Sequence, residues 1–392
     1  MQPRCGANCS RLAKQDSGHY STHLFTARAQ EVIQQHDTSE PLFLYLAYQA
    51  VHAPLEVPQS YVDAYAGSIE DPQRRGFAGM LSCLDEGLGN VTGALRAKGM
   101  LEDTLVIFTT DNGGPSSGRV GGDYIGSSNY PLRGGKHSIW EGGTRGTALV
   151  WAGAATGLLP QARQGSVARA LMHAADWLPT LCAIAGASGS CDHLPLDGVD
   201  QTGALFRGEP GRRREVLYGR HDDASERHDG YDTAVRDDDG WKLLQNWGGQ
   251  PDEWSQQVNC TAEASECQAA AAAAPPTAPR GPPAAMLFNV LDDPGERHDR
   301  AFERPDVARR LSQRLAAFRA EQVDVVGGGG HPDPACPPYR MADHVDADVG
   351  HFWEPWCAAG TTAGRGAPGP PEPRGGPEDG VIRHLGEQQH VV

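Results

Sequence analysis

Residues 104–110 read Thr-Leu-Val-Ile-Phe-Thr-Thr, and residues 111–114 follow them directly as Asp-Asn-Gly-Gly. A run of apolar and β-branched residues that ends in turn-forming residues is typical of a strand buried on both faces. Residues 41–47 (PLFLYLA) and residues 147–151 (TALVW) have the same character. The sequence therefore predicts three buried strands.

Helical patterns lie between and after these strands. Apolar residues recur at intervals of three and four over 22–36, from Phe77 to Leu95 and over 166–184, and Gly99 stands where the second helix is expected to end. Alternation of buried strands with long helices is typical of a parallel sheet that is covered by helices on both faces. We therefore predict an α/β fold with a mainly parallel sheet flanked by helices.

The pattern changes near residue 208. Beyond it, short strands are predicted at 241–244 and 286–290, and a helix at 307–318. The predicted segments are an α/β unit at 1–208, a small sheet-plus-helix (α+β) domain at 209–326 with a low-complexity insert at 268–285, a C-terminal extension at 327–357 and a disordered Gly/Pro-rich tail at 358–392.

The composition excludes some classes of partner. The 392 residues include 34 basic and 50 acidic side chains, and the formal net charge is −16. A negative surface repels phosphate backbones, so we expect no nucleic-acid partner. We find no run of the about 18 apolar residues that a membrane span needs, and residues 1–12 lack the apolar centre of a secretory signal. We therefore expect neither a membrane span nor a signal peptide in this chain.

Nine cysteines and three glycosylation sequons favour an oxidising compartment. Cys83 lies in the apolar stripe of a predicted helix, where we expect a buried free thiol. The candidate glycosylation sites are Asn8, Asn90 and Asn259. The remaining cysteines fall in four loose sequence pairs, which are Cys5/Cys9, Cys182/Cys191, Cys260/Cys267 and Cys336/Cys357.

Polar residues that are able to carry chemistry follow two of the predicted strands. Asp111 and Asn112 offer hard oxygen ligands for calcium or magnesium, although Asp-Asn-Gly-Gly is also an ordinary turn. His52 follows the strand at 41–47, where an imidazole can give a proton to a leaving group or serve a structural role. Lys136 lies in a glycine-rich stretch and either binds an oxyanion or is solvated. Each of these residues, taken alone, leaves both interpretations open.

Further motifs follow one another between residues 131 and 297. They are residues 131–136 (PLRGGK), 140–146 (WEGGTRG), 176–180 (DWLPT), 195–198 (PLDG), 241–244 (WKLL), 287–290 (LFNV) and 293–297 (DPGER). Together with His52 and residues 111–114, this series resembles the sulfatase family, and most closely its arylsulfatase B group. Chance agreement of several independent motifs in one order is improbable.

The resemblance implies a calcium-dependent hydrolase of sulfate esters with an alkaline-phosphatase-like α/β fold and a small C-terminal domain. By resemblance, Asp111 and Asn112 match two calcium ligands, and Lys136 matches the lysine that holds the sulfate. His52 matches a histidine that contacts the sulfate or its leaving oxygen. The cation and the ammonium group would stabilise developing negative charge while the imidazole supplies a proton. The implied substrates are sulfated glycans or aryl sulfate esters, and the implied location is lysosomal or secreted.

The chain also departs from the family pattern. Sulfatases have two further aspartate ligands and a Cys-x-Pro-Ser-Arg signature whose cysteine becomes formylglycine, the nucleophile, and we find none of these in residues 1–392. We therefore expect an N-terminally incomplete fold, weak calcium binding, no nucleophile in this chain and no activity of this chain alone. Three hypotheses remain open: a truncated sulfatase sequence, a non-catalytic sulfatase-like protein that binds glycans or a partner, and a phosphodiesterase or phosphatase of the same superfamily with different metals. The stretches 133–136 and 140–146 resemble sulfatases specifically and disfavour the third.

Overall fold

The structure is a computed structural model. It divides into two units, one formed by His19–Asp222 and Arg227–Arg319 and the other by the chain ends and Asp223–Glu226. The candidate site and its framework lie in the first unit. The residues described are 16, 18–115, 119–120, 123–124, 126–191, 195–219, 233–245, 248–249, 252–254, 285–321, 345–346 and 350–351.

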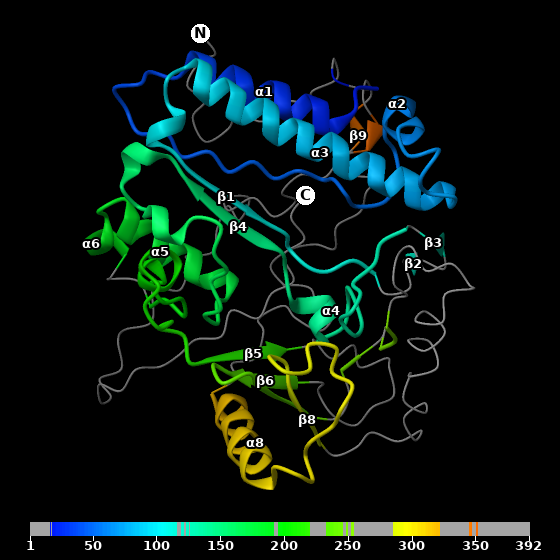
Figure 1. Cartoon of the computed structure of the whole chain (residues 1–392), viewed down its shortest axis with the longest axis vertical. Helices are drawn as coiled ribbons and strands as arrows, with labels where there is room; N and C mark the ends of the chain where they lie inside the picture. The colour runs from blue at the N-terminus through cyan, green and yellow to red at the C-terminus, as the bar shows by residue number, and fades with distance from the viewer. Residues whose placement is uncertain are drawn as a thin grey trace, which may run out of the picture. The chain divides into compact units, whose positions relative to one another are not determined.

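Two long helices, α1 (Ser21–Gln35) and α3 (Pro72–Ala97), lie side by side (Figure 1) and confirm two predicted helices. α3 begins earlier than its apolar pattern, because the side chain of Asp71 accepts a hydrogen bond from the N–H of the third helical residue and Pro72 suits the first turn. Gly99 follows the helix with φ +76°, as its predicted end position requires. Cys83 on α3 is buried and free, as predicted.

β1 (Leu105–Thr109) and β4 (Ala148–Ala152) confirm the positions of two predicted strands but correct two predictions about them. The strands are not buried on both faces, since most of their side chains are half-buried or exposed, and their direction differs. The two strands pair antiparallel, with Leu105 opposite Ala152. Every strand pair among the described residues is antiparallel. Parallel neighbours need a long crossover, usually a helix, whereas the described chain between β1 and β4 contains only the four-residue helix α4 (Glu141–Thr144) and two short strands. The prediction of a mainly parallel sheet is therefore wrong for these residues.

The strand predicted at 41–47 is also wrong. This segment is extended but pairs with no described strand. Leu42 and Leu46 pack against the core between α1 and α3, whereas Phe43 and Tyr45 are 77% and 75% exposed. Alternate side chains therefore face the helices, and the apolar run reflects packing on one face without a strand ladder.

The C-terminal part forms an antiparallel sheet with strand order β5-β6-β7-β8 and one long helix, α8 (Pro305–Ala320). This confirms the helix predicted at 307–318 and the strands predicted at 241–244 and 286–290. The first two strands of this sheet, β5 and β6, were not predicted from the sequence. The domain boundary at 208/209 remains a prediction. The strands are β5 (Glu215–Gly219), β6 (Thr233–Asp237), β7 (Trp241–Gln245) and β8 (Ala285–Asn289).

The two faces of this sheet pack against different segments. Leu243 and its neighbours on one face contact α8, which lies along the sheet in Figure 1. Leu244 and its neighbours on the other face contact Ile139 and Trp140, from the glycine-rich segment before α4. Side chains alternate along a strand, so Lys242 faces the same way as Leu244. The glycine-rich segment therefore forms the second layer of the sheet.

Only the second half of the helix predicted at 166–184 is helical. His173 and Asp176 cap the chain there by reciprocal side-chain to backbone hydrogen bonds, so a short 3₁₀ turn and then α5 (Trp177–Ile184) begin after them. Residues 166–173 precede this cap and form no helix.

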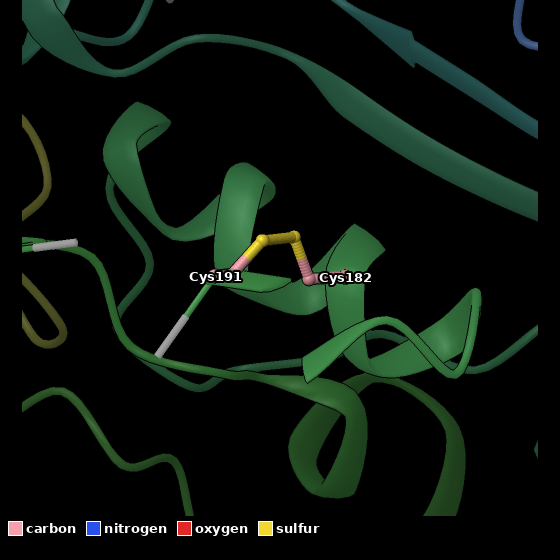
Figure 2. Close-up of a disulfide and its surroundings, with 2 residues drawn as sticks. All are labelled: Cys182 and Cys191. Carbon is pink, nitrogen blue, oxygen red and sulfur yellow. A yellow bond between two sulfur atoms is a disulfide. The ribbon is translucent and has the colours of Figure 1, made fainter. Parts of the chain in front are cut away.

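The disulfide between Cys182 and Cys191 links α5 to the short helix α6 (Ser188–Cys191), as Figure 2 shows, and confirms one of the predicted pairs. The other three pairs lie outside the described residues. So do Asn8 and Asn259, whereas Asn90 is exposed on α3. Within the described part of the chain, no helix has the length and apolar character needed to cross a membrane.

The remaining elements are short. They are α2 (Gln59–Asp63), β2 (Arg119–Val120), β3 (Asp123–Tyr124), β9 (Val345–Asp346), β10 (Gly350–His351), a π-helical turn (Gly203–Arg207) and 3₁₀ turns at Leu101–Asp103, Ala154–Thr156, Gln161–Arg163 and Ala174–Asp176.

The core between the sheet and α8 predicts the effect of a cavity. Leu311 on α8 is fully buried, so Leu311→Ala is expected to lower the free energy of unfolding by about 2–5 kcal/mol. Leu81→Ala is the control, because Leu81 is 50% exposed and its truncation leaves a much smaller void. Urea unfolding followed by circular dichroism measures both variants. Equal losses would contradict the described packing of α8.

Candidate functional site

The structure brings His52 and Lys136 into contact although they are 84 positions apart in the chain. The Nζ atom of Lys136 lies 3.1 Å from Nε2 of His52, and Nδ1 of His52 lies 2.7 Å from the carbonyl oxygen of Ala53. An ammonium group only donates hydrogen bonds, so Nε2 accepts and Nδ1 carries the proton that it donates to Ala53. His52 is exposed and Lys136 partly buried, so this neutral imidazole and its ammonium partner face solvent.

Asp111 and Asn112 lie on the loop that follows β1, and this loop contacts the segment that carries Lys136. The backbone N–H of Lys136 donates to the carbonyl oxygen of Gly114 at 2.9 Å. The carboxylate of Asp111 accepts from the N–H of Asn112 at 2.8 Å, and the side-chain amide of Asn112 donates to Gly113 at 2.8 Å. The loop thus joins the strand end to the lysine segment.

Asn129 stabilises the contact between the loop after β1 and the segment that carries Lys136. This role was not predicted from the sequence. The side-chain amide of Asn129 donates to the carbonyl oxygens of Gly114 at 2.7 Å and Gly134 at 3.0 Å, and its oxygen accepts from the N–H of Gly114 at 2.9 Å. A backbone hydrogen bond of 3.0 Å from Gly113 to Gly143 adds to the contact. An asparagine within a glycine-rich stretch was the available signal, because its side chain can replace missing backbone partners in a loop.

The segment 131–143, named here the lysine loop, is bound to the C-terminal part through Arg133. The guanidinium carbon of Arg133 lies 3.7 Å from the ring centre of Trp140 and 4.7 Å from that of Trp254. Its Nε donates to the carbonyl oxygen of Asp252 at 2.9 Å. Burial lowers the pKa of this guanidinium. Stacking between two indoles stabilises a planar cation and fixes the start of the loop.

A buried charge cluster fixes the other end of the lysine loop. The ammonium of Lys242 lies 3.0 Å from a carboxylate oxygen of Glu141 and 3.0 Å from one of Glu296, and all three side chains are at most 1% exposed. Arg236 lies 3.8 Å from the second oxygen of Glu141. Glu141, Lys242 and Glu296 belong to motifs noted in the sequence, whereas Arg236 belongs to none, and nothing in the motifs indicated that these side chains meet.

Burial and pairing act in opposite directions on this cluster. Burial raises the pKa of Glu296 to about 7. Burial opposes ionisation of Glu141 as well, but the ammonium of Lys242 and the guanidinium of Arg236 hold the pKa of Glu141 below its ordinary value. The two carboxylates are therefore unequal, and Glu296 is the one that takes up a proton first.

Asp111 and Asn112 fit a calcium ion by chemistry but do not complete its shell. Their carboxylate and amide oxygens are hard ligands, and calcium takes about six to eight of them. Among the residues described, no group of three or more His, Cys, Asp or Glu side chains is placed to hold a metal ion. The structure supplies two candidate ligands at the end of β1.

The junction at Gly113 predicts a destabilising substitution. A Cβ atom at position 113 would overlap the carbonyl oxygen of Gly142, so Gly113→Ala is expected to lower the free energy of unfolding by about 1–3 kcal/mol. The control Gly89→Ala is expected to raise it by about 1 kcal/mol, because a Cβ there meets nothing within 4 Å and alanine favours the helix. Thermal or urea unfolding measures both. Stabilisation by Gly113→Ala would contradict the close approach of the two loops.

The raised pKa of Glu296 predicts a pH effect on stability. The folded-state pKa of about 7 exceeds the ordinary value of 4.5, so the stability linked to the bound proton is complete below pH 4.5 and is lost as the pH rises through 7. The free energy of unfolding is therefore expected to fall less between pH 5 and pH 8 in Glu296→Gln than in the wild type. Glu303→Gln, at an exposed position, controls for loss of a carboxyl group. If the free energy of unfolding of the wild type and of Glu296→Gln changed equally with pH, the raised pKa of Glu296 would be refuted.

The chain is similar to known sulfatases in sequence. Residues 1–187 match the Sulfatase family model. Arylsulfatase J of Mus musculus is 34% identical over 79% of this chain and 50% of its own length. N-acetylgalactosamine-6-sulfatase of Mus musculus is 26% identical over 78% of this chain and 54% of its own length. The chain thus spans about half the length of these curated relatives.

Solved structures of sulfatases share the fold. The crystal structure of Ps i-CgsB in complex with k-i-k-neocarrahexaose is 25% identical, has a TM-score of 0.57 and aligns with 76% of this chain and 55% of that protein. The putative sulfatase yidJ from Bacteroides fragilis has 15% identity, a TM-score of 0.53 and coverage of 77% and 58%. These matches confirm the predicted alkaline-phosphatase-like α/β class. The family model and the relatives show that the chain belongs to the sulfatase family.

Proposed function

We propose that this chain takes part in the hydrolysis of sulfate esters, as an arylsulfatase-type protein similar to the arylsulfatase B group. Its substrates would be sulfated glycans or aryl sulfate esters. The contact between Lys136 and His52 is the observation that carries the proposal, because it joins an anion-binding cation to a group that can carry a proton. Membership of the sulfatase family supports the same chemistry.

Lys136 would bind the sulfate and His52 would act on the leaving oxygen. The ammonium group of Lys136 stabilises negative charge on the sulfonyl oxygens. His52 holds its proton on Nδ1, against Ala53, and presents Nε2 toward the ammonium group. To act as a general acid, Nε2 would take up a proton from solvent and give it to the ester oxygen as the bond between sulfur and that oxygen breaks.

Asp111 and Asn112 would contribute two oxygen ligands to a calcium ion. When bound, calcium would stabilise negative charge on the sulfate group. Both residues are held by hydrogen bonds within their own loop, and that loop bonds to the backbone of Lys136. The ligand pair is therefore part of the same framework as the proposed sulfate-binding lysine. With two ligands, we expect calcium to bind this chain weakly.

We propose that this chain alone binds sulfate esters without turning them over. The Cys-x-Pro-Ser-Arg sequence that the family uses to form its nucleophile does not occur among residues 1–392. A non-catalytic protein that binds sulfated glycans would show the same behaviour, so binding and turnover have to be measured separately.

We propose a lysosomal or extracellular location. The disulfide between Cys182 and Cys191 supports it, because disulfides persist in oxidising compartments. The exposed position of Asn90 on α3 leaves its sequon open to glycosylation.

The proposal predicts that Lys136 determines the affinity for a sulfate ester. Lys136→Ala is expected to weaken binding of 4-nitrocatechol sulfate roughly 10- to 100-fold, because a hydrogen bond to a charged group contributes about 1.5–3 kcal/mol. Equilibrium dialysis of the full chain with calcium present measures the affinity. Lys98→Ala is a matched control, since Lys98 is bonded to the carbonyl oxygen of Gln34, away from the site.

Two outcomes would count against the proposal. Equal affinities of wild type and Lys136→Ala would remove Lys136 from the sulfate site. Release of 4-nitrocatechol by the wild-type chain, abolished by Asp111→Ala, would show that the chain is active by itself.

A further inference from the structure

Lys242 makes two hydrogen bonds with its ammonium group, both to the lysine loop, and an ion pair with Glu296. The Nζ atom donates to the carbonyl oxygen of Ile139 at 2.8 Å and to the carboxylate of Glu141 at 3.0 Å. Its third partner, at 3.0 Å, is the carboxylate of Glu296. Lys242 is completely buried.

Glu296 also binds the backbone of residues 139–141. Its second carboxylate oxygen accepts a hydrogen bond of 2.7 Å from the backbone N–H of Glu141. The carbonyl of Ile139 and the N–H of Glu141 are therefore both bonded to buried charged groups of the C-terminal part. Hydrogen bonds to charged groups are stronger than neutral ones, so this stretch of backbone is firmly placed.

A tight turn transmits this placement to Lys136. The hydroxyl of Ser138 donates to the carbonyl oxygen of Gly135 at 2.7 Å and accepts from the N–H of Gly135 at 3.2 Å. Lys136 and His137 lie between these two residues, and His137 has a left-handed φ of +77°. The turn is closed on both sides of Lys136, so a shift of Ile139 moves the backbone of Lys136 with it.

We propose that Lys242 is a positioning residue for anion binding, which sets the place of Lys136 through Ile139 and Glu141. The inference rests on the proposed function in one respect, namely that Lys136 binds the sulfate group. Lys242 itself is buried behind the loop and touches no substrate. Its role is to hold the ammonium of Lys136 against His52, where the two groups act together.

A spectroscopic signal of Lys136 tests the proposal independently of overall stability. The chain has four lysines, at positions 14, 98, 136 and 242, so labelling with [ε-¹³C]lysine gives few signals. Lys136→Arg assigns the Lys136 signal, and His52→Ala shows its position when the contact with His52 is lost. In Lys242→Met, the Lys136 signal is expected to move toward its position in His52→Ala while the Lys98 signal stays in place. A merely structural role would leave the Lys136 signal of the folded protein unchanged.

A milder variant keeps the test decisive if Lys242→Met does not fold. Glu296→Gln preserves the shape of the side chain and removes the charge, so a smaller shift in the same direction is expected. Arg314→Met is the control, because it breaks the ion pair between α8 and Glu215 on β5 without touching the lysine loop.

Binding of 4-nitrocatechol sulfate to the same full-length proteins distinguishes the positioning role of Lys242 from the proposed binding of sulfate by Lys136. Weaker binding in Lys242→Met and Glu296→Gln, with wild-type affinity in Arg314→Met, supports the positioning role. Wild-type signal and affinity in every folded variant of the cluster would overturn it, provided that Lys136→Ala loses binding. Unchanged affinity of Lys136→Ala would instead overturn the proposed function.

Discussion

The contact of a buried ammonium with two buried carboxylates joins the lysine loop to the C-terminal sheet. Lys242 lies on the C-terminal sheet, Glu141 lies at the start of α4, and Glu296 follows β8. A charge that is removed from water is costly unless it is paired, so burial of the Lys242 ammonium depends on its carboxylate partners. The docking of the lysine loop on the sheet, and through it the placement of Lys136 beside His52, depends on this constraint.

Local patterns predicted the helices and strands that are defined by their own residues. α1, α3, α8 and both strands of the first pair follow from apolar spacing and from caps such as Asp71 and Gly99. The direction of pairing and the degree of burial did not follow, because an apolar run does not specify which segments pack against it. The segment 41–47 shows this plainly, since Phe43 and Tyr45 are exposed while the alternate side chains pack on helices. β5 and β6 lack a distinct pattern of their own and are defined by the sheet they join.

The residues of the candidate site were predictable where a motif contains a side chain with a recognisable chemical role. His52, Lys136, Asp111 and Asn112 were singled out from their places after strands and in glycine-rich turns, and the structure joins the first two directly. The supporting residues were not predictable in the same way. Asn129, Arg133 and Lys242 act through partners that are distant in the chain, and sequence spacing carries no information about such contacts.

The stacking of Arg133 between Trp140 and Trp254 has a consequence for the inheritance of this architecture. One indole is supplied by the lysine loop and the other by a segment more than a hundred positions later, so the guanidinium joins both in a single sandwich. Recombination that exchanged only the later segment with that of a distant homologue could replace Trp254. The buried guanidinium of Arg133 would then lose one of its two aromatic contacts. The two segments are therefore expected to change together among homologues, despite their distance in the chain.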